Sequence, residues 1–316
     1  HPPAYMPENC NLEEVKHNKK FVDIPVVCAG KMDTLTAAKA VGRGEIDAMG
    51  VARQYLADPQ WVTKTLEGRE EDIRPCIHCH NGCFNLAHYK GVGNDQTLHD
   101  NAGMARCALN PETMQSKKYK IVPAKKQKKV AIVGGGIGGM ETARVLALRG
   151  HKPTIFEKSG ALGGVFVAAA APQFKSADKA LLKWYEKQMK DLSIDIRFNT
   201  VVKPSDTLTG FDEVAGARGA PAKRVPVKGA EKCIEACDYL SGAPVGDKIV
   251  VIGGGLTGCE IALDAHLKGR TPVIVEMKND LIAVKGVCLA NSSYLREYFA
   301  LHKVEVHLES TVKEVG

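Results

Sequence analysis

A segment repeated within the chain constrains its fold most strongly. Residues 130–158 align without a gap on residues 249–277, at a constant offset of 119. Each copy combines a short apolar strand, a glycine-rich turn, a helix and a second strand, which predicts two parallel α/β dinucleotide-binding units. The positions identical in both copies are, in the numbering of the first, Gly134, Gly135, Gly136, Gly139, Glu141, Ala143, Leu148, Gly150, Pro153, Ile155 and Glu157.

The residues of the first copy have mechanical reasons to be where they are. Gly134 permits the tight turn from strand to helix, and Gly136 lets the backbone approach a pyrophosphate. Gly139 allows the helix to pack closely on the strand, and the helix N-terminus then holds the phosphates. Glu157 follows at the distance where an acid accepts hydrogen bonds from ribose hydroxyls.

Two dinucleotide units in one chain predict a flavin and a nicotinamide. The first should hold FAD, because Gly163 and Gly164 form a second close-approach loop after its acid. The second should hold NAD(H), since Glu276 would repel the 2′-phosphate of NADP(H), although Arg270 and Lys278 nearby keep NADP(H) as the less favoured alternative. The residues of the second turn that would bind its dinucleotide are Gly253, Gly255, Gly258 and Glu276.

A group of cysteines precedes the first copy. Three thiols on a tight loop, with a fourth returning later, suit the corners of a cubane iron–sulfur cluster. Structural zinc sites more often use two separated cysteine pairs, or cysteines with histidines. We expect His78 and His80, between these cysteines, to point to solvent or to a neighbouring cofactor and not to bind metal. The predicted cluster ligands are Cys76, Cys79, Cys83 and Cys107.

Composition narrows the class of protein further. The 316 residues predict two or three domains, and 44% hydrophobic with 25% charged residues is ordinary for a globular protein. We find no apolar run that could span a membrane and no export signal, so we expect a cytoplasmic protein whose ten cysteines are not disulfides. Part of the net charge of +7 lies in a lysine-rich stretch over residues 117–129. It lacks aromatic interleaving and predicts a solvated linker, not a nucleic-acid site.

Short motifs before the second half carry a family resemblance. Residues 1–75 alternate strands (25–29 and 46–51) with helices (35–42 and 59–66), which is typical of parallel α/β structure. Gly30-Lys31, the run 48–53, residues 57–59, the Arg74-Pro75-Cys76 loop and both glycine-rich turns follow in that order. The chain thereby resembles the multi-cofactor branch of the old yellow enzyme family, which includes 2-enoate reductases, 2,4-dienoyl-CoA reductase, bile-acid oxidoreductases and trimethylamine dehydrogenase.

The resemblance implies an α/β chain of four parts. Residues 1–75 would be the end of an FMN-binding TIM barrel, 76–124 a [4Fe-4S] segment, 125–242 the first part of an FAD domain and 243–316 an incomplete NAD(P)-binding domain. Most of the barrel, with the expected catalytic residues, and the end of the FAD domain would be missing. Residues 211–220 replace an apolar strand of the family with a shorter, more polar version, so we expect the crossover between the two dinucleotide units to pack differently. The residues implied to hold the FMN phosphate are Gly30, Lys31, Gly50 and Arg53.

The resemblance also implies a function. NADH would pass electrons through FAD and a [4Fe-4S] cluster to FMN, which would reduce the activated C=C bond of a small 2-enoate or enoyl-CoA substrate. Two alternatives remain open at this stage: an amine-dehydrogenase-like flavoprotein, and an electron-transfer subunit without a substrate site of its own. A homo-oligomer is compatible with the sequence.

Overall fold

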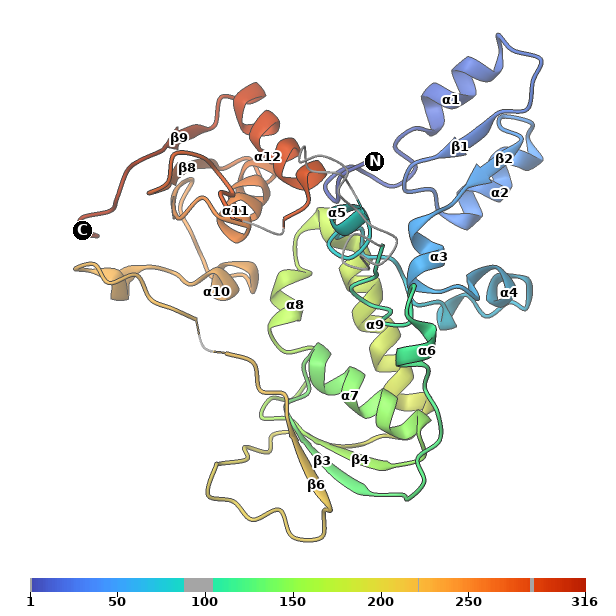
Figure 1. Cartoon of the computed structure of the whole chain (residues 1–316). Coiled ribbons are helices and arrows are strands. Elements are labelled where there is room, and N and C mark those ends of the chain that lie inside the picture. The colour runs from blue at the N-terminus through green and yellow to red at the C-terminus, as the bar shows by residue number, and fades with distance from the viewer. Residues whose placement is uncertain (1, 88–104, 221, 285–286) are drawn as a thin grey trace, which may run out of the picture.

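The computed structural model describes residues 2–87, 105–220, 222–284 and 287–316. Its strands form three parallel sheets, ordered β1-β2, β5-β4-β3-β6 and β7-β8-β9, and Figure 1 shows the three parts of the chain that carry them. A polar, glycine-rich insert at residues 91–103, between the third and fourth predicted cluster cysteines, lies outside the described residues. Within the described part, no helix is both long and apolar enough to cross a bilayer.

The N-terminal part alternates helices and strands as the sequence predicts. Asp33 caps its second helix, because its Oδ1 accepts a hydrogen bond from the Thr36 N–H at 2.8 Å. Two short helices flank the later cysteine, α5 (Phe84–Ala87) and α6 (Ser116–Tyr119), and a 3₁₀ helix covers Glu70–Asp72. The earlier elements are α1 (Leu12–Lys19), β1 (Val27–Ala29), α2 (Thr34–Gly42), β2 (Ala48–Gly50), α3 (Arg53–Ala57) and α4 (Trp61–Leu66).

The first repeat copy forms the sheet at the bottom of Figure 1. The helices α7 and α9 contact each other over one face of this sheet. Within residues 211–220, Glu213–Gly216 form β6, which pairs in parallel with β3, so this short polar segment keeps an ordinary sheet position. The packing of the crossover that follows it stays a prediction. The elements are β3 (Lys129–Val133), α7 (Ile137–Leu148), β4 (Lys152–Phe156), α8 (Val165–Ala169), α9 (Ser176–Asp191), β5 (Asp195–Arg197) and β6 (Glu213–Gly216).

The second copy repeats the same geometry at the predicted offset. Val130 pairs with Pro153 in the first sheet, and Ile249 pairs with Pro272 in the second, so the registers of the two copies correspond. The elements of this part are α10 (Ala236–Leu240), β7 (Lys248–Ile252), α11 (Leu256–Leu267), β8 (Thr271–Val275), α12 (Leu289–Leu301) and β9 (Glu305–His307).

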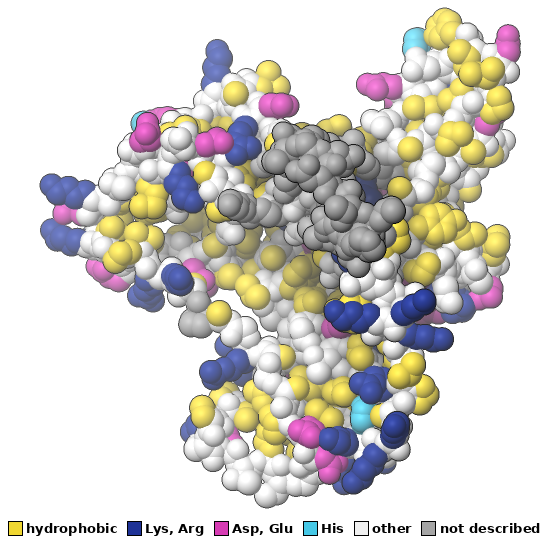
Figure 2. All heavy atoms as spheres, viewed as in Figure 1, with side chains coloured by type: hydrophobic (Ala, Val, Ile, Leu, Met, Phe, Trp, Pro, Cys, Tyr) yellow, Lys and Arg dark blue, Asp and Glu magenta, His cyan; other side chains and the backbone are white. Residues whose placement is uncertain are grey.

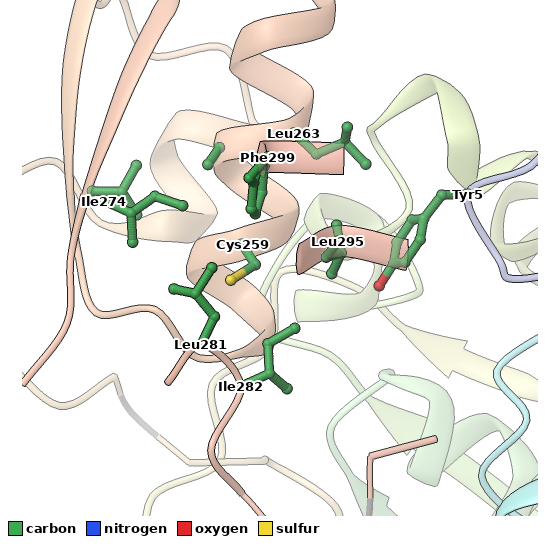
Figure 3. Close-up of a cluster of buried hydrophobic side chains, with 10 residues drawn as sticks. Tyr5, Cys259, Leu263, Ile274, Leu281, Ile282, Leu295 and Phe299 are labelled. Carbon is green, nitrogen blue, oxygen red and sulfur yellow. The ribbon is translucent and has the colours of Figure 1, made fainter. Parts of the chain in front are cut away.

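The apolar core of the second copy includes a residue from the far end of the chain. Tyr5 is buried with Leu263, Ile274, Leu295 and Phe299, and Figure 3 shows its ring beside Leu295. Burying one such side chain contributes about 1.5–3 kcal/mol, so this contact ties the N-terminal segment firmly to the second dinucleotide unit.

The lysine-rich stretch is largely exposed. Figure 2 shows basic side chains over this part of the chain, beside α6 and the start of β3. This agrees with the solvated linker that its composition predicts.

Candidate functional site

The first glycine-rich turn is built by close backbone approaches. Gly134 has a φ of +110°, and a Cβ there would lie 2.5 Å from the Ala217 carbonyl oxygen. A Cβ on Gly139 would lie 1.9 Å from the Gly134 carbonyl oxygen, so α7 packs on the turn with no space for a methyl group. A Cβ on Gly136 would meet only the Gly163 carbonyl oxygen, at 3.9 Å. The turn is therefore tight where the chain packs and open at Gly136, where a pyrophosphate is predicted.

The predicted second loop lies beside this turn. Gly163 pairs with Gly136 in an isolated parallel bridge, and its N–H donates to the Gly135 carbonyl at 2.9 Å. Gly163 and Gly164 both have positive φ, which favours glycine. The structure thus brings the two glycine loops of the first unit together.

The acid that ends each βαβ copy contacts the glycine-rich turn. Glu157 is buried, and its Oε2 accepts a 2.7 Å hydrogen bond from the Gly135 N–H. Its Oε1 accepts from the N–H and the hydroxyl of Ser159, at 2.8 and 2.7 Å. Burial acts to raise the pKa of Glu157, but these hydrogen bonds outweigh it and leave the pKa below its ordinary value. The carboxylate is held charged at the turn, a role that sequence reasoning missed.

The second turn repeats this arrangement. Glu276 Oε2 accepts from the Gly254 N–H at 2.6 Å, and Oε1 accepts from the Lys278 N–H at 2.8 Å. A Cβ on Gly258 would lie 1.9 Å from the Gly253 carbonyl oxygen, as at the matching position of the first turn. Gly255 has no atom within 4 Å of a Cβ built on it, so the predicted phosphate position is open.

The two cations near Glu276 are engaged elsewhere. The ammonium of Lys278 donates to the Ala283 carbonyl at 3.0 Å. The Arg270 guanidinium donates to the carbonyls of Val245 and Gly246, at 2.5 and 2.6 Å. Arg270 also precedes β8, whereas Glu276 follows it, so the two lie at opposite ends of that strand.

A pocket of about 690 Å³ gathers the residues predicted to hold an FMN phosphate. β1 and β2 are parallel, so the turns after them meet at one edge, and Ala29 pairs with Gly50 there. The lining residues that matter here are Gly30, Lys31, Gly50, Arg53, Cys76 and His78.

The two cations of this pocket already have partners. The Lys31 ammonium donates to the carbonyls of Ala4 and Met6, at 2.9 and 2.5 Å, and burial lowers its pKa. An Arg53 Nη1 lies 2.5 Å from His80 Nε2. His80 is only 1% exposed, so it does not point to solvent, and its orientation toward a neighbouring cofactor stays a prediction. Burial, reinforced by the charge of Arg53, lowers the pKa of His80 to about 4, so the imidazole is neutral at pH 7.

The four predicted cluster cysteines are electrostatic neighbours. The charges of Cys79 and Cys107 act on Cys76, and those of Cys83 and Cys107 act on Cys79. A Cβ on Gly82 would lie 2.9 Å from the backbone around Cys107, so this glycine lets the two cysteine segments touch. In the described ranges, no three His, Cys, Asp or Glu side chains converge on a point that would hold a single metal ion.

Backbone donors point at these sulfur atoms. Burial raises the pKa of Cys76 to about 12, while a hydrogen bond from the His78 N–H acts in the opposite direction. Burial likewise raises the pKa of Cys79, while a hydrogen bond from the Asn81 N–H acts to lower it. The Leu109 N–H lies 3.4 Å from the Cys107 Sγ. Buried thiols with N–H donors need a nearby positive charge to become thiolates, which is what a bound iron–sulfur group supplies.

Gln54 is a site residue that the sequence analysis missed. Its Oε1 accepts from the Cys76 N–H at 2.9 Å and its Nε2 donates to the Arg74 carbonyl at 2.8 Å. The amide therefore holds the backbone on both sides of Pro75 and links the start of α3 to the cysteine loop. A lone glutamine next to Arg53 carries no spacing signal from which this could be predicted.

Comparison with known proteins places these features in a family. A family model described as pyridine nucleotide-disulphide oxidoreductase matches residues 93–215 and 205–316. Cinnamate reductase of Clostridium sporogenes is 38% identical over 318 residues, covering 99% of this chain and 46% of that protein. NADH oxidase of Thermoanaerobacter brockii is 35% identical over 274 residues, covering 83% of this chain and 40% of that protein.

A solved structure agrees with these relatives. A 2-naphthoyl-CoA reductase in complex with 2-naphthoyl-CoA matches with a TM-score of 0.85 at 28% identity, covering 99% of this chain and 47% of the other. The chain thus spans about half the length of the proteins it matches. The resemblance to enoate-reductase-type flavoproteins that the motifs predicted is confirmed.

Proposed function

Because the chain belongs to the pyridine nucleotide-disulphide oxidoreductase family, we propose that it carries electrons from NADH toward the reduction of an activated C=C bond. One observation carries the proposal: residues expected to bind an FMN phosphate line one pocket together with Cys76, the first cysteine of the predicted cluster. Cinnamate reductase, the most nearly full-length match to this chain among the relatives above, is named for a substrate with such a bond.

The two glycine-rich turns would hold the dinucleotides. Gly136 and Gly255 leave the backbone open where a pyrophosphate approaches, and the helices that start behind them, α7 and α11, direct their N-termini there. FAD would occupy the first unit, since the loop at Gly163 narrows this site from a second side. When bound, FAD accepts an electron pair from NADH and releases electrons singly, which is why a one-electron carrier is needed beside it.

The cysteine segment would hold a [4Fe-4S] cluster. The four thiols are neighbours without converging on one point, and a cubane distributes its four thiolates over four iron atoms. The N–H groups directed at Cys76, Cys79 and Cys107 favour bound thiolates and would tune the cluster's potential. Lys31 and Arg53, at the same pocket as Cys76, would hold the FMN phosphate, with the Lys31 ammonium exchanging a carbonyl partner for it.

The second unit favours NADH over NADPH. Glu276 would accept hydrogen bonds from the ribose hydroxyls of NADH and would repel a 2′-phosphate, whereas Arg270 lies at the other end of β8 with its guanidinium on the carbonyls of Val245 and Gly246. The exposed Lys278 keeps NADPH as the less favoured alternative.

Anaerobic purification of this chain tests the proposal. We expect about four irons and four sulfides per chain, bound flavin, and bleaching of the flavin by NADH. Zinc without sulfide would rule out the cluster assignment. Because this chain alone is expected to be inactive on substrate, the reductase itself is tested on a chain extended upstream to restore the barrel. Reoxidation of that reduced, extended protein by cinnamate supports the C=C reductase, whereas NADH-driven dye reduction alone favours an electron-transfer role without a substrate site.

A further inference from the structure

We infer that Trp184, which contacts both Arg74 and Arg144, is a positioning residue that fixes the cysteine loop against the first dinucleotide unit. Trp184 lies in α9 and is 6% exposed. The Arg74 guanidinium carbon lies 4.9 Å from the centroid of its ring and that of Arg144 lies 5.6 Å away. The indole Nε1–H donates to the Asp72 carbonyl at 3.1 Å. Residues 112 positions apart thus meet on one aromatic side chain.

Arg74 connects this contact to both ends of the cysteine segment. It stands two residues before Cys76, and its Nη1 donates to the Leu109 carbonyl at 2.6 Å, two residues after Cys107. Its backbone N–H donates to Asp58 at 3.0 Å. The Arg74 side chain therefore connects the start of the predicted cluster segment, near Cys76, with its end, near Cys107.

Arg144 connects the same contact to the dinucleotide turn. It lies on α7, the helix that begins at the glycine-rich turn, and makes a bidentate pair with Glu141 at 2.8 Å. The Tyr185 hydroxyl donates to the same carboxylate at 3.2 Å. Any shift of α7 is thereby passed to Trp184 and to the cysteine loop.

The helix that carries Trp184 also reaches the pocket. Ser176, Ala177 and Ala180, in its first turns, line the pocket with Cys76. Since α9 is one continuous helix from Ser176 to Asp191, it fixes the pocket, the cysteine loop and the first unit relative to one another.

The contacts of Trp184 with Arg74, Arg144 and the Asp72 carbonyl, which we call the joint, contain more charge than simple packing requires. The Arg144 guanidinium is buried and that of Arg74 is partly buried, and the Glu141 carboxylate pairs with Arg144. The Nε of Arg74 is buried without a hydrogen-bond partner. Apolar side chains would fill the same space without burying charge, whereas two cations over the ring and the hydrogen bond of its Nε1–H to Asp72 fix the orientation of the indole.

If the proposed function holds, this joint sets the separation between the first dinucleotide site and the cluster. Arg144→Met should leave NADH-driven bleaching of the flavin unchanged but slow the following reduction of the cluster by at least about tenfold. Iron, sulfide and flavin contents should match those of the unaltered chain. Arg149→Met, on the exposed end of the same helix, is the matched control and should change neither rate.

A second readout needs no bound cofactor. In the cofactor-free chain, Arg144→Met and Trp184→Leu should raise the rate at which a thiol reagent modifies the cysteine loop by about tenfold, because the loop is released from α9. Arg144→Lys, which keeps a cation near the indole, should restore part of the protection. Trp184→Phe provides a milder variant should the larger changes prevent folding.

The outcomes separate this inference from the proposed function. Unchanged thiol reactivity in Arg144→Met and Trp184→Leu would overturn the joint itself. Exposed thiols with an unchanged rate of cluster reduction would reduce Trp184 to a packing residue. Absence of iron and sulfide from the unaltered chain would refute the cluster, while the thiol measurement would still decide whether the joint exists.

Discussion

Replacing Gly139 by alanine tests how the first glycine-rich turn is built. The added Cβ would lie 1.9 Å from the Gly134 carbonyl oxygen and 3.0 Å from its carbonyl carbon. Those atoms are backbone, and the Gly134 N–H is bonded to the Phe156 carbonyl at 2.9 Å, so the turn cannot yield. The helix α7 must move away from β3 instead. Overpacking of this kind costs about 1–3 kcal/mol, and contact with fixed backbone places this case near the upper limit.

Gly138, the preceding residue on the same helix, is the matched control. A Cβ there meets nothing within 4 Å, so Gly138→Ala should stabilise the chain by about 1 kcal/mol through helix propensity. Because both variants gain that propensity, they should differ by the clash alone, about 3 kcal/mol, or roughly a 140-fold change in the unfolding equilibrium.

Urea unfolding measures this difference as a change in midpoint at constant slope. Titration with FAD should show weaker binding by Gly139→Ala and unchanged binding by Gly138→Ala. Gly258→Ala repeats the test in the second unit, where the Cβ contact is also 1.9 Å. If Gly139→Ala unfolds at the same urea concentration as Gly138→Ala, the close approach of helix and turn is not as described.

Three further predictions concern single carboxylates. Burial raises the pKa of Asp178 to about 6, so the unfolded chain loses this proton first and stability should fall by about 2 kcal/mol as pH rises from 4 to 6. Asp178→Asn should flatten that fall in urea midpoints measured across this range, and an unaltered profile would contradict the assignment. Asp58→Ala should lower the free energy of unfolding in urea by about 3 kcal/mol, because the half-buried Lys64 ammonium, 2.6 Å from the Asp58 carboxylate, would lose its counter-charge. A loss near zero would show that this ion pair does not stabilise the fold. Glu276→Gln should raise the ratio of kcat/KM for NADPH over NADH by roughly tenfold in dye reduction, and an unchanged ratio would mean that Glu276 does not face the ribose.

The repeat made the two dinucleotide units predictable from sequence. Both copies carry the same strand, turn and helix signals, and the structure reproduces them at the same offset. By contrast, β6 contains Glu213 and lacks an apolar pattern, yet it pairs with β3 through backbone hydrogen bonds, which do not depend on side-chain type.

The sequence identified many single residues of the candidate site, but not the contacts that connect them to one another. Glycines, acids and cysteines were identified by spacing, because their chemistry requires a fixed separation along the chain. The contacts of Gln54 with the cysteine loop and of Trp184 with Arg74 join residues without any periodic relation. Such contacts depend on the packing of distant elements, which one sequence does not reveal.

The repeated glutamate on the turn helices has different partners in the two units. In the first unit, Glu141 binds Arg144 and Tyr185, both from the same unit. The matching residue of the second unit, Glu260, accepts from the Tyr5 hydroxyl at 3.0 Å and from the Lys175 ammonium at 2.8 Å.

Tyr5 belongs to the N-terminal segment and Lys175 immediately precedes α9. Glu141 therefore binds residues of its own unit, whereas Glu260, at the matching position, connects the second unit to the N-terminal segment and to the start of α9. Since α9 also carries the Trp184 contact, the second unit, the pocket and the cysteine loop are all positioned from one helix. A path for electrons across several cofactors requires fixed distances, and a single shared helix is a direct way to provide them.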